Sequence, residues 1–245
     1  LVISTSNESK KLTLVDNLSF ELLPSEILSI VGESGSGKSI TAKSILGLLP
    51  KNFSVSGEIK YYEKNLIQTD EKAMLSVRGH EIGLVFQEPM TALNPVLSIG
   101  EQLTESMIIS GKVNSKVAHG LALEMLNRVG IPHPKERMEQ FPHEFSGGMR
   151  QRILIAMMML MEPNILIADE PTTALDVTIQ AQILYLLSAL VQEEKMSMIL
   201  ITHDMGVVAQ TADRVLVMKD GKKIEDGEVE EIFVGSKENY TNQLL

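Results

Sequence analysis

The chain contains no cysteine, which excludes disulfide bonds, thiolate metal ligands and a catalytic thiol. Long hydrophobic runs are also missing. The longest apolar run near the middle covers residues 153–161, whereas a membrane-spanning helix needs about 20 such residues. Positive charge is in deficit, and the net charge of −10 argues against a nucleic-acid partner held through its phosphates. We therefore expect a soluble protein, or a soluble part of a larger one, that binds no nucleic acid.

The rest of the composition is that of an ordinary globular protein. Hydrophobic residues make up 44% and charged residues 22% of the 245 positions, close to the average for folded domains. A chain of this length can bury the core of one α/β domain and still have room for a small insertion.

A glycine-rich loop at residues 32–39 (GESGSGKS) matches the pattern G-x-x-x-x-G-K-[ST]. An apolar strand is predicted before it at residues 27–31, and a helical pattern follows it and stops at Pro50. In this setting the glycines let backbone amides face phosphate groups, Lys38 supplies a charge, and the Ser39 hydroxyl ligates Mg²⁺. The alternative is a Gly/Ser-rich turn that merely links strand to helix, which the flanking elements disfavour.

Two carboxylates end another apolar strand, predicted at residues 165–168. If this strand runs parallel to the first, Asp169 reaches the Mg²⁺ ion through water. Glu170 is then placed to orient or deprotonate the attacking water. The alternative is a core strand whose acidic end is simply solvated.

Three further polar residues follow predicted strands or precede a helix. Gln87, after the strand at residues 82–86, offers a donor and an acceptor and can sense both Mg²⁺ and the attacking water. His203, after the strand at residues 198–202, can donate a hydrogen bond to the γ-phosphate. The alternatives are that Gln87 is an ordinary surface residue of a loop and that His203 has a purely structural role, as is usual for such residues taken singly. Asp176 has an equally simple alternative role as the cap of the next helix.

The remaining elements follow from periodicity and turn residues. Strands of an antiparallel sheet are expected around residues 12–22 and 57–67, and a helical insertion at 92–160. Helical periodicity runs from Ile99 to about Val129, with Val117, Leu121 and Met125 at spacing four and Ala118, Ala122 and Val129 near the same face. A helix is expected at about 178–194, and a hairpin of strands 214–218 and 222–225 around Asp220-Gly221.

The ordered motifs are similar to those of the ATP-binding cassette family over essentially the whole chain. They are residues 32–39, Gln87, Ser146-Gly147-Gly148, Asp169-Glu170, residues 174–176 and His203. The resemblance implies a P-loop NTPase fold with a RecA-like core, an antiparallel β subdomain and an inserted α-helical subdomain. It implies a single domain over 1–245, with core and β subdomain at 1–91 and 161–245 and the helical subdomain at 92–160.

The resemblance also implies ATP and Mg²⁺ as cofactors and assigns the site residues. Catalytic residues are Glu170, His203, Gln87 and Lys38; nucleotide-binding residues are Gly32, Glu33, Ser34, Gly35, Ser36, Gly37, Lys38, Ser39 and Ile40; Mg²⁺ is held by Ser39, Gln87 and Asp169; and Ser146, Gly147, Gly148 and Asp176 act in trans on nucleotide bound by a second cassette.

The partners that the resemblance implies are a second ABC ATPase domain, as a homodimer or paralogous heterodimer, and transmembrane permease subunits. A periplasmic or extracellular substrate-binding protein takes part indirectly, and the location is the cytoplasmic face of the cell membrane.

Longer phrases narrow the resemblance to one branch. Residues 86–95, 141–152 and 168–182 are similar to the ATPases of oligopeptide, dipeptide and nickel importers, and Met149 is typical of that branch. The expected function is ATP hydrolysis coupled to import of oligopeptides or dipeptides. Alternatives are a nickel or metal-chelate importer of the same branch, a soluble cassette ATPase not coupled to transport, and a non-hydrolysing nucleotide switch. Ser9 stands where many relatives place an aromatic that stacks on adenine.

Overall fold

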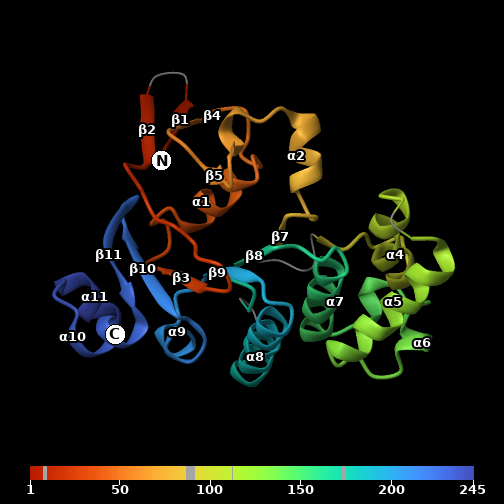
Figure 1. The fold of residues 1–245 in the computed structure, drawn as a ribbon. Coiled ribbons are helices and arrows are strands. Elements are labelled where there is room, and N and C mark those ends of the chain that lie inside the picture. The colour runs from red at the N-terminus through yellow and green to blue at the C-terminus, as the bar shows by residue number, and fades with distance from the viewer. Residues whose placement is uncertain (8–9, 87–91, 112, 173–174) are drawn as a thin grey trace. The chain divides into compact units, whose positions relative to one another are not determined.

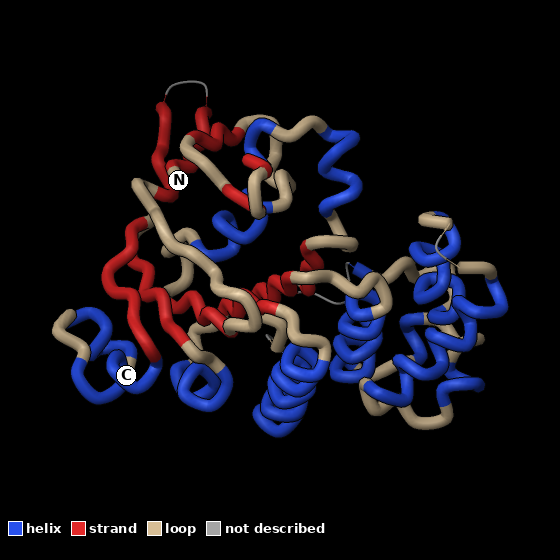
Figure 2. Tube along the Cα trace, in the orientation of Figure 1, coloured by secondary structure: helices blue, strands red, loops and turns tan. Residues whose placement is uncertain are grey.

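The computed structural model describes residues 1–7, 10–86, 92–111, 113–172 and 175–245, and Figures 1 and 2 show its helices and strands. The chain forms two units: Leu1–Arg78 with Lys195–Leu245, and Gly79–Glu194. The first unit contains β1 Val2–Asn7, β2 Lys10–Val15, β3 Ile27–Val31, α1 Lys38–Ile45, β4 Phe53–Ser56, β5 Lys60–Tyr61, β6 Lys64–Asn65, η1 Leu66–Gln68, α2 Glu71–Val77, β9 Ser197–Ile201, α9 Met205–Thr211, β10 Arg214–Lys219, β11 Lys222–Glu228, α10 Val229–Gly235 and α11 Asn239–Leu244. The second unit contains β7 Ile82–Val85, α4 Ile99–Ile109, α5 Ser115–Arg128, α6 Pro134–Arg137, η2 Pro142–Glu144, α7 Gly147–Met159, β8 Ile165–Asp169 and α8 Val177–Glu193.

The main sheet of the first unit has the strand order β11-β10-β3-β9. Strands β10, β3 and β9 run parallel, and β11 pairs antiparallel with β10. Every residue of β3 and β9 is buried, as expected for the near-continuous apolar runs of parallel strands. The strands predicted at these places are confirmed, with β9 beginning and ending one residue earlier than expected.

The β10–β11 hairpin turns at Asp220-Gly221, as the dipeptide predicts. Asp220 has φ +48° and Gly221 has φ +77°, and both values lie in the left-handed region that a two-residue hairpin turn of type I′ requires. Glycine is also needed sterically at position 221, because a Cβ there would lie 2.3 Å from the carbonyl oxygen of Leu14.

A second sheet of the first unit has the order β2-β1-β4 and is antiparallel, as expected. The predicted extent is wrong. The strand expected to run to residue 22 ends at Val15, because the Asp16 amide donates to Gly221 and Asn17 adopts a left-handed φ of +50°. In place of a strand over residues 57–67 there are two strands of two residues each and a short 3₁₀ helix.

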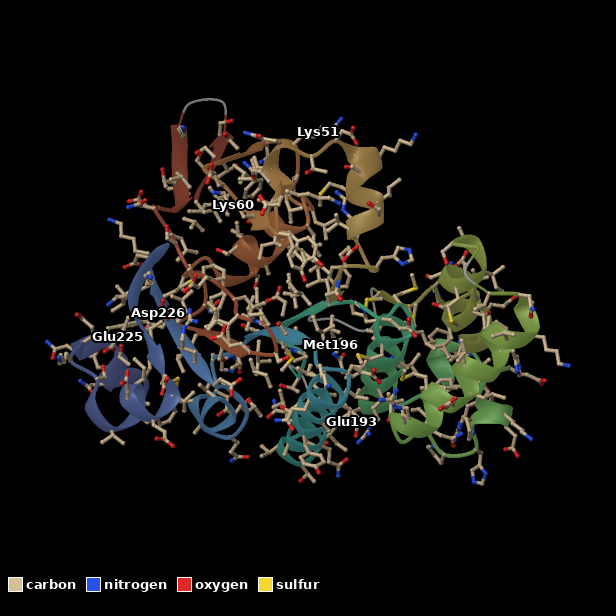
Figure 3. The ribbon with its side chains drawn as sticks, viewed as in Figure 1. Lys51, Lys60, Glu193, Met196, Glu225 and Asp226 are labelled. Atoms are coloured by element: carbon tan, nitrogen blue, oxygen red, sulfur yellow. The ribbon has the colours of Figure 1, made fainter. Side chains whose placement is uncertain are left out.

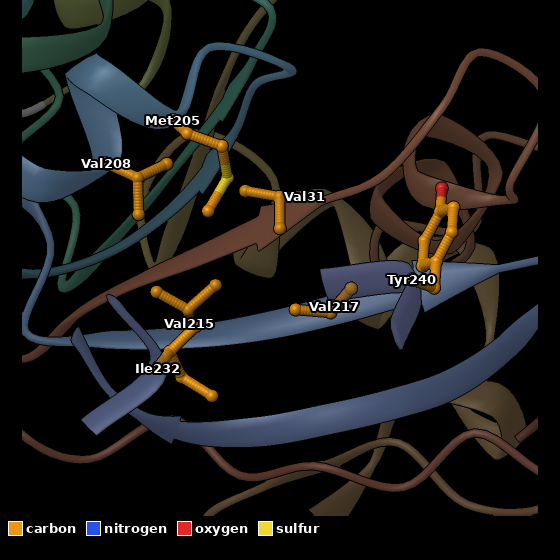
Figure 4. Packing of buried hydrophobic residues seen from close by; sticks show 7 residues of the cluster. All are labelled: Val31, Met205, Val208, Val215, Val217, Ile232 and Tyr240. Carbon is orange, nitrogen blue, oxygen red and sulfur yellow. The ribbon is translucent and has the colours of Figure 1, made fainter. Parts of the chain in front are cut away.

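Helices α9, α10 and α11 pack on the main sheet of the first unit. A cluster of buried side chains joins them to the strands, and Figure 4 shows it at close range: Val31, Met205, Val208, Val215, Val217, Ile232 and Tyr240.

In the second unit, β7 and β8 form a parallel pair in which Val85 lies opposite Ala168. The helical periodicity expected from Ile99 to Val129 is divided between α4 and α5. The division occurs because Gly111 adopts a left-handed φ of +71° and Asn114 caps α5 by accepting a hydrogen bond from Val117 N–H at 3.0 Å.

The predicted apolar face of α5 is confirmed in part, because Met125 and Val129 on it are buried. Ala118, Ala122 and Leu126 are fully buried, whereas Val117 and Leu121 are 45% and 40% exposed. Spacing alone cannot separate two adjacent helical stripes when both carry apolar residues. In the described part of the chain, no helix combines the length and the apolarity that crossing a bilayer requires.

Candidate nucleotide-binding site

The phosphate loop links β3 to α1, and its glycines are needed for steric reasons. A Cβ on Gly32 (φ +149°) would lie 2.1 Å from the carbonyl oxygen of Met218. One on Gly37 (φ +103°) would lie 3.1 Å from Cγ2 of Val15, whereas Gly35 (φ +83°) faces open space. Side chains other than hydrogen would be strained at all three positions. The backbone of the loop can therefore approach a ligand closely.

Lys38 lies inside this loop and is only 4% exposed. Its Nζ donates hydrogen bonds to the carbonyl oxygens of Gly32 and Glu33, both at 2.8 Å, and to Ser36 Oγ at 3.3 Å. Lys38 also begins helix α1, where Gly37 at the N-cap provides no side chain to compete with an anion for the first amides. The ammonium and these amides together suit a phosphate group.

Helix α1 ends at Ile45, earlier than the predicted stop near Pro50. Gly47 adopts a left-handed φ of +63° and its amide bonds back to Ser44, which terminates the helix. Ser39 and Ile40 lie half-buried in the first turn, and Glu33, Ser34 and Gly35 form the exposed part of the loop.

His203 belongs to the same unit and follows the neighbouring strand. Ile30 of β3 pairs with Ile201 of β9, so the phosphate loop and His203 leave the sheet at the same edge. Ligands of open α/β sheets bind at this carboxyl edge. The His203 side chain is exposed, and Asp204 caps α9 directly after it by accepting from the Gly206 amide.

Asp169 and Glu170 lie at the end of β8 in the second unit. Asp169 is 4% exposed, and Glu170 is half-buried. Glu170 adopts a left-handed backbone with φ +46°, which costs a non-glycine residue roughly 1–2 kcal/mol. Backbone strain of this kind is concentrated at functional sites. Glu162, outside the predicted site, has a similar φ of +55°, so this conformation alone assigns no role to Glu170.

The Ser-Gly-Gly cluster forms the start of α7, also in the second unit. Ser146 caps the helix by accepting from the Met149 amide at 3.3 Å. A Cβ on Gly148 would lie 2.7 Å from Ile179 Cγ2. The first turn of α7 therefore packs directly against the first turn of α8.

Asp176 begins α8 beside this cluster. Its Oδ1 accepts from the Ile179 amide at 3.0 Å, so the helix-capping alternative raised for it is confirmed. A role for Asp176 across a dimer interface stays a prediction.

The predicted site residues thus divide between the units. The loop residues 32–40 and His203 lie in the first unit; Asp169, Glu170, Ser146, Gly147, Gly148 and Asp176 lie in the second. Gln87, and Ser9 where an adenine-stacking aromatic was looked for, lie outside the described residues.

Three residues make supporting hydrogen bonds that the sequence patterns did not predict. Tyr240 Oη accepts from the Glu33 amide at 3.1 Å, and the Gly221 amide donates to the Ser36 carbonyl at 3.1 Å. In the second unit, Arg152 of α7 donates to the carbonyl oxygen ending α5 and to Gln182 of α8. Burial lowers the pKa of Arg152.

A glycine loop that closes a buried parallel strand and opens a helix around an internal lysine defines a P-loop nucleotide-binding fold. Comparison with protein families matches residues 15–173 to the ABC transporter family. The chain is 53% identical over 233 residues to the dipeptide transport ATP-binding protein DppD of Bacillus subtilis (strain 168), a match covering 94% of this chain and 70% of that protein. It is 50% identical over 247 residues to the oligopeptide transport ATP-binding protein OppD of the same organism, covering 100% and 69%.

Solved structures agree with this assignment. A dimeric post-hydrolysis state of the ATP-binding cassette MJ0796 bound to ADP and Pi superimposes with a TM-score of 0.82 at 27% identity, covering 93% of this chain and 96% of that one. The structure of cbiO1 from Clostridium perfringens, part of the ABC transporter complex cbiONQ, superimposes with a TM-score of 0.80 at 29% identity, covering 95% of this chain and 90% of that one. The chain therefore belongs to the ABC transporter family. It is an ATPase with the P-loop NTPase fold, and its cofactors are ATP and Mg²⁺.

Proposed function

We propose that this chain is the ATP-hydrolysing subunit or domain of an importer for dipeptides or oligopeptides. The geometry that carries the ATPase part is the loop of residues 32–39 with the buried Lys38 ammonium inside it. The import of peptides is supported by the relatives DppD and OppD, which match nearly the whole chain at about half identity.

Each predicted site residue has a role in this proposal. Lys38 and the amides of residues 32–40 bind the phosphates, and Ser39 with Asp169 and Gln87 holds Mg²⁺, which when bound offsets the negative charge of the phosphate oxygens. Glu170 orients the attacking water and accepts its proton. His203 donates a hydrogen bond to the γ-phosphate from the carboxyl edge of the sheet.

The proposal includes a second cassette, either another copy or a related chain, arranged head to tail. Ser146, Gly147 and Gly148 begin a long helix, and its N-terminal amides and dipole suit an anionic phosphate held by the partner. Asp176, beside them, communicates across the same interface. Solved dimers of a cassette with this fold support pairing with a second cassette.

The same proposal places the chain at the cytoplasmic face of the membrane, bound to permease subunits and indirectly served by a substrate-binding protein outside. It takes residues 92–160 as the helical subdomain and residues 1–91 and 161–245 as the core with its β subdomain.

The proposal is tested by replacing Glu170 with Gln, which keeps the size and removes the base. We expect Glu170→Gln to bind ATP normally and to hydrolyse it about 10²–10⁴-fold more slowly, measured as phosphate release. Glu162→Gln is the matched control, because Glu162 also has a left-handed backbone (φ +55°) but is exposed in a turn before β8. Near-normal hydrolysis by Glu170→Gln would show that the role proposed for Glu170 is wrong.

A further inference from the structure

The phosphate loop is hydrogen-bonded to two residues that lie far from it in the sequence. The Glu33 amide donates to Tyr240 Oη at 3.1 Å, and the Gly221 amide donates to the Ser36 carbonyl at 3.1 Å. Tyr240 belongs to α11, and Gly221 to the β10–β11 turn. Tyr240 is 207 positions away from the residue that it contacts.

The contact with Tyr240 acts on one particular peptide unit. The carbonyl of Gly32 and the amide of Glu33 belong to the same planar group and point in opposite directions. The carbonyl accepts from Lys38 Nζ at 2.8 Å, while the amide donates to Tyr240. Rotation of this plane would move both groups together. The tyrosine hydroxyl therefore fixes the direction of a carbonyl that positions the Lys38 ammonium.

Tyr240 is itself well fixed. It is 7% exposed, and its ring belongs to the buried cluster with Val31 and Val217. The ammonium of Lys219 lies 4.4 Å from the ring centroid, a cation–π contact. Figure 4 shows the hydroxyl on the side of the ring away from Val217. The buried ring holds the side chain in place, and the hydroxyl makes the hydrogen bond to the phosphate loop.

We propose that Tyr240 is a positioning residue of the nucleotide site, and that it couples helix α11 to the phosphate loop. The inference rests on the proposed ATP site and adds a residue to it. Coupling between two positions is reciprocal. Phosphate binding in the loop therefore stabilises α11, and loss of the hydroxyl weakens phosphate binding.

The test is Tyr240→Phe, which keeps the ring, the buried cluster and the cation–π contact. Loss of one neutral hydrogen bond corresponds to a 2- to 10-fold weaker affinity, on the order of magnitude measured for such bonds. We expect this loss for ATP and for ADP, titrated against a fluorescent ATP analogue, and no loss for adenosine, which lacks the phosphates. Tyr185→Phe is the control, because Tyr185 is exposed on α8.

Hydrogen exchange supplies a second measurement. Saturating ATP should slow amide exchange in α11 of the wild-type chain, and Tyr240→Phe should remove that protection. Unchanged ATP affinity in Tyr240→Phe, or equal losses for ATP and adenosine, would overturn the inference and leave the proposed function intact. A wild-type chain that binds no ATP would overturn both.

Discussion

Lys38 shows how a single side chain organises the phosphate loop. Its ammonium bridges two backbone carbonyls and the Ser36 hydroxyl, while its stem is buried at the start of α1. A buried ammonium needs such partners, because burial without them is costly. The same geometry concentrates positive charge and amide donors where phosphate groups bind.

At this scale we predict that Lys38→Ala weakens nucleotide binding about 10- to 100-fold, since hydrogen bonds to charged groups contribute about 1.5–3 kcal/mol. Titration with a fluorescent ATP analogue measures the effect. Lys43→Ala is the control, because Lys43 lies in the last turn of the same helix. If both variants bound nucleotide equally well, Lys38 would not contact the phosphates.

Local chemistry of this kind can be predicted from sequence. The loop motif needs only a strand before it and a helix after it, and both are encoded by neighbouring residues. The support from Tyr240 could not be predicted, because it depends on folding across 207 positions. The left-handed backbone of Glu170 was equally hidden, since nothing in its residue type favours that conformation.

At the scale of elements, the Ser-Gly-Gly cluster has a packing role besides the proposed one in trans. The short distance from a Cβ on Gly148 to Ile179 Cγ2, 2.7 Å, leaves no room for a methyl group between α7 and α8. Ile179 is β-branched and stiff, so it cannot easily turn away. This glycine is therefore required within the chain.

We predict that Gly148→Ala destabilises the folded chain by about 1–3 kcal/mol, the usual cost of overpacking, measured by urea unfolding. In an Ile179→Ala background, which lacks the obstructing methyl, Gly148→Ala should cost less. Gly120→Ala is the control, because a Cβ there meets nothing within 4 Å in helix α5; it should stabilise the helix by up to about 1 kcal/mol. Equal effects of the two alanines would contradict the packing role.

Glu225 of β11 accepts hydrogen bonds from the segment between α10 and α11, and this contact should make the stability of that segment depend on pH. Burial raises the pKa of the Glu225 carboxyl (labelled in Figure 3), but hydrogen bonds outweigh it and hold the pKa below its ordinary value. The Ser236 hydroxyl donates at 2.6 Å, and the Lys237 amide also donates. Because the unfolded carboxyl has the higher pKa, the stabilisation is complete above about pH 4.3 and is lost as the pH falls through the lower folded pKa.

The pH dependence of this stabilisation is measured by amide hydrogen exchange in α11, corrected for the intrinsic effect of pH on exchange rates. Glu225→Gln should exchange faster than wild type at neutral pH, and the difference should disappear as the pH falls through the lowered pKa of Glu225 in the folded chain. Glu230→Gln, at an exposed position of α10, is the control and should match wild type throughout. A difference that persisted undiminished in acid would contradict the role of the Glu225 charge.

At the scale of the whole molecule, the order of strands and helices was predictable because the parallel strands are nearly continuous apolar runs. Prediction was weakest where the signals are short or ambiguous. The two-residue strands β5 and β6 have no periodicity to detect, and α5 carries apolar residues on two adjacent stripes. In the sequence, the proposed partner cassette is indicated by Ser146, Gly147, Gly148 and Asp176.

Completion of the site by a second cassette is the central claim, and light scattering on the Glu170→Gln chain tests it most directly. This variant should bind ATP without consuming it, so the account predicts the mass of two chains in ATP with Mg²⁺ and of one chain in ADP. Adding Ser146→Arg, which places a bulky cation at the proposed interface, should return the mass in ATP to one chain. The same mass in ATP and ADP, for this chain alone and for its mixture with the related cassette of its transporter, would contradict the account.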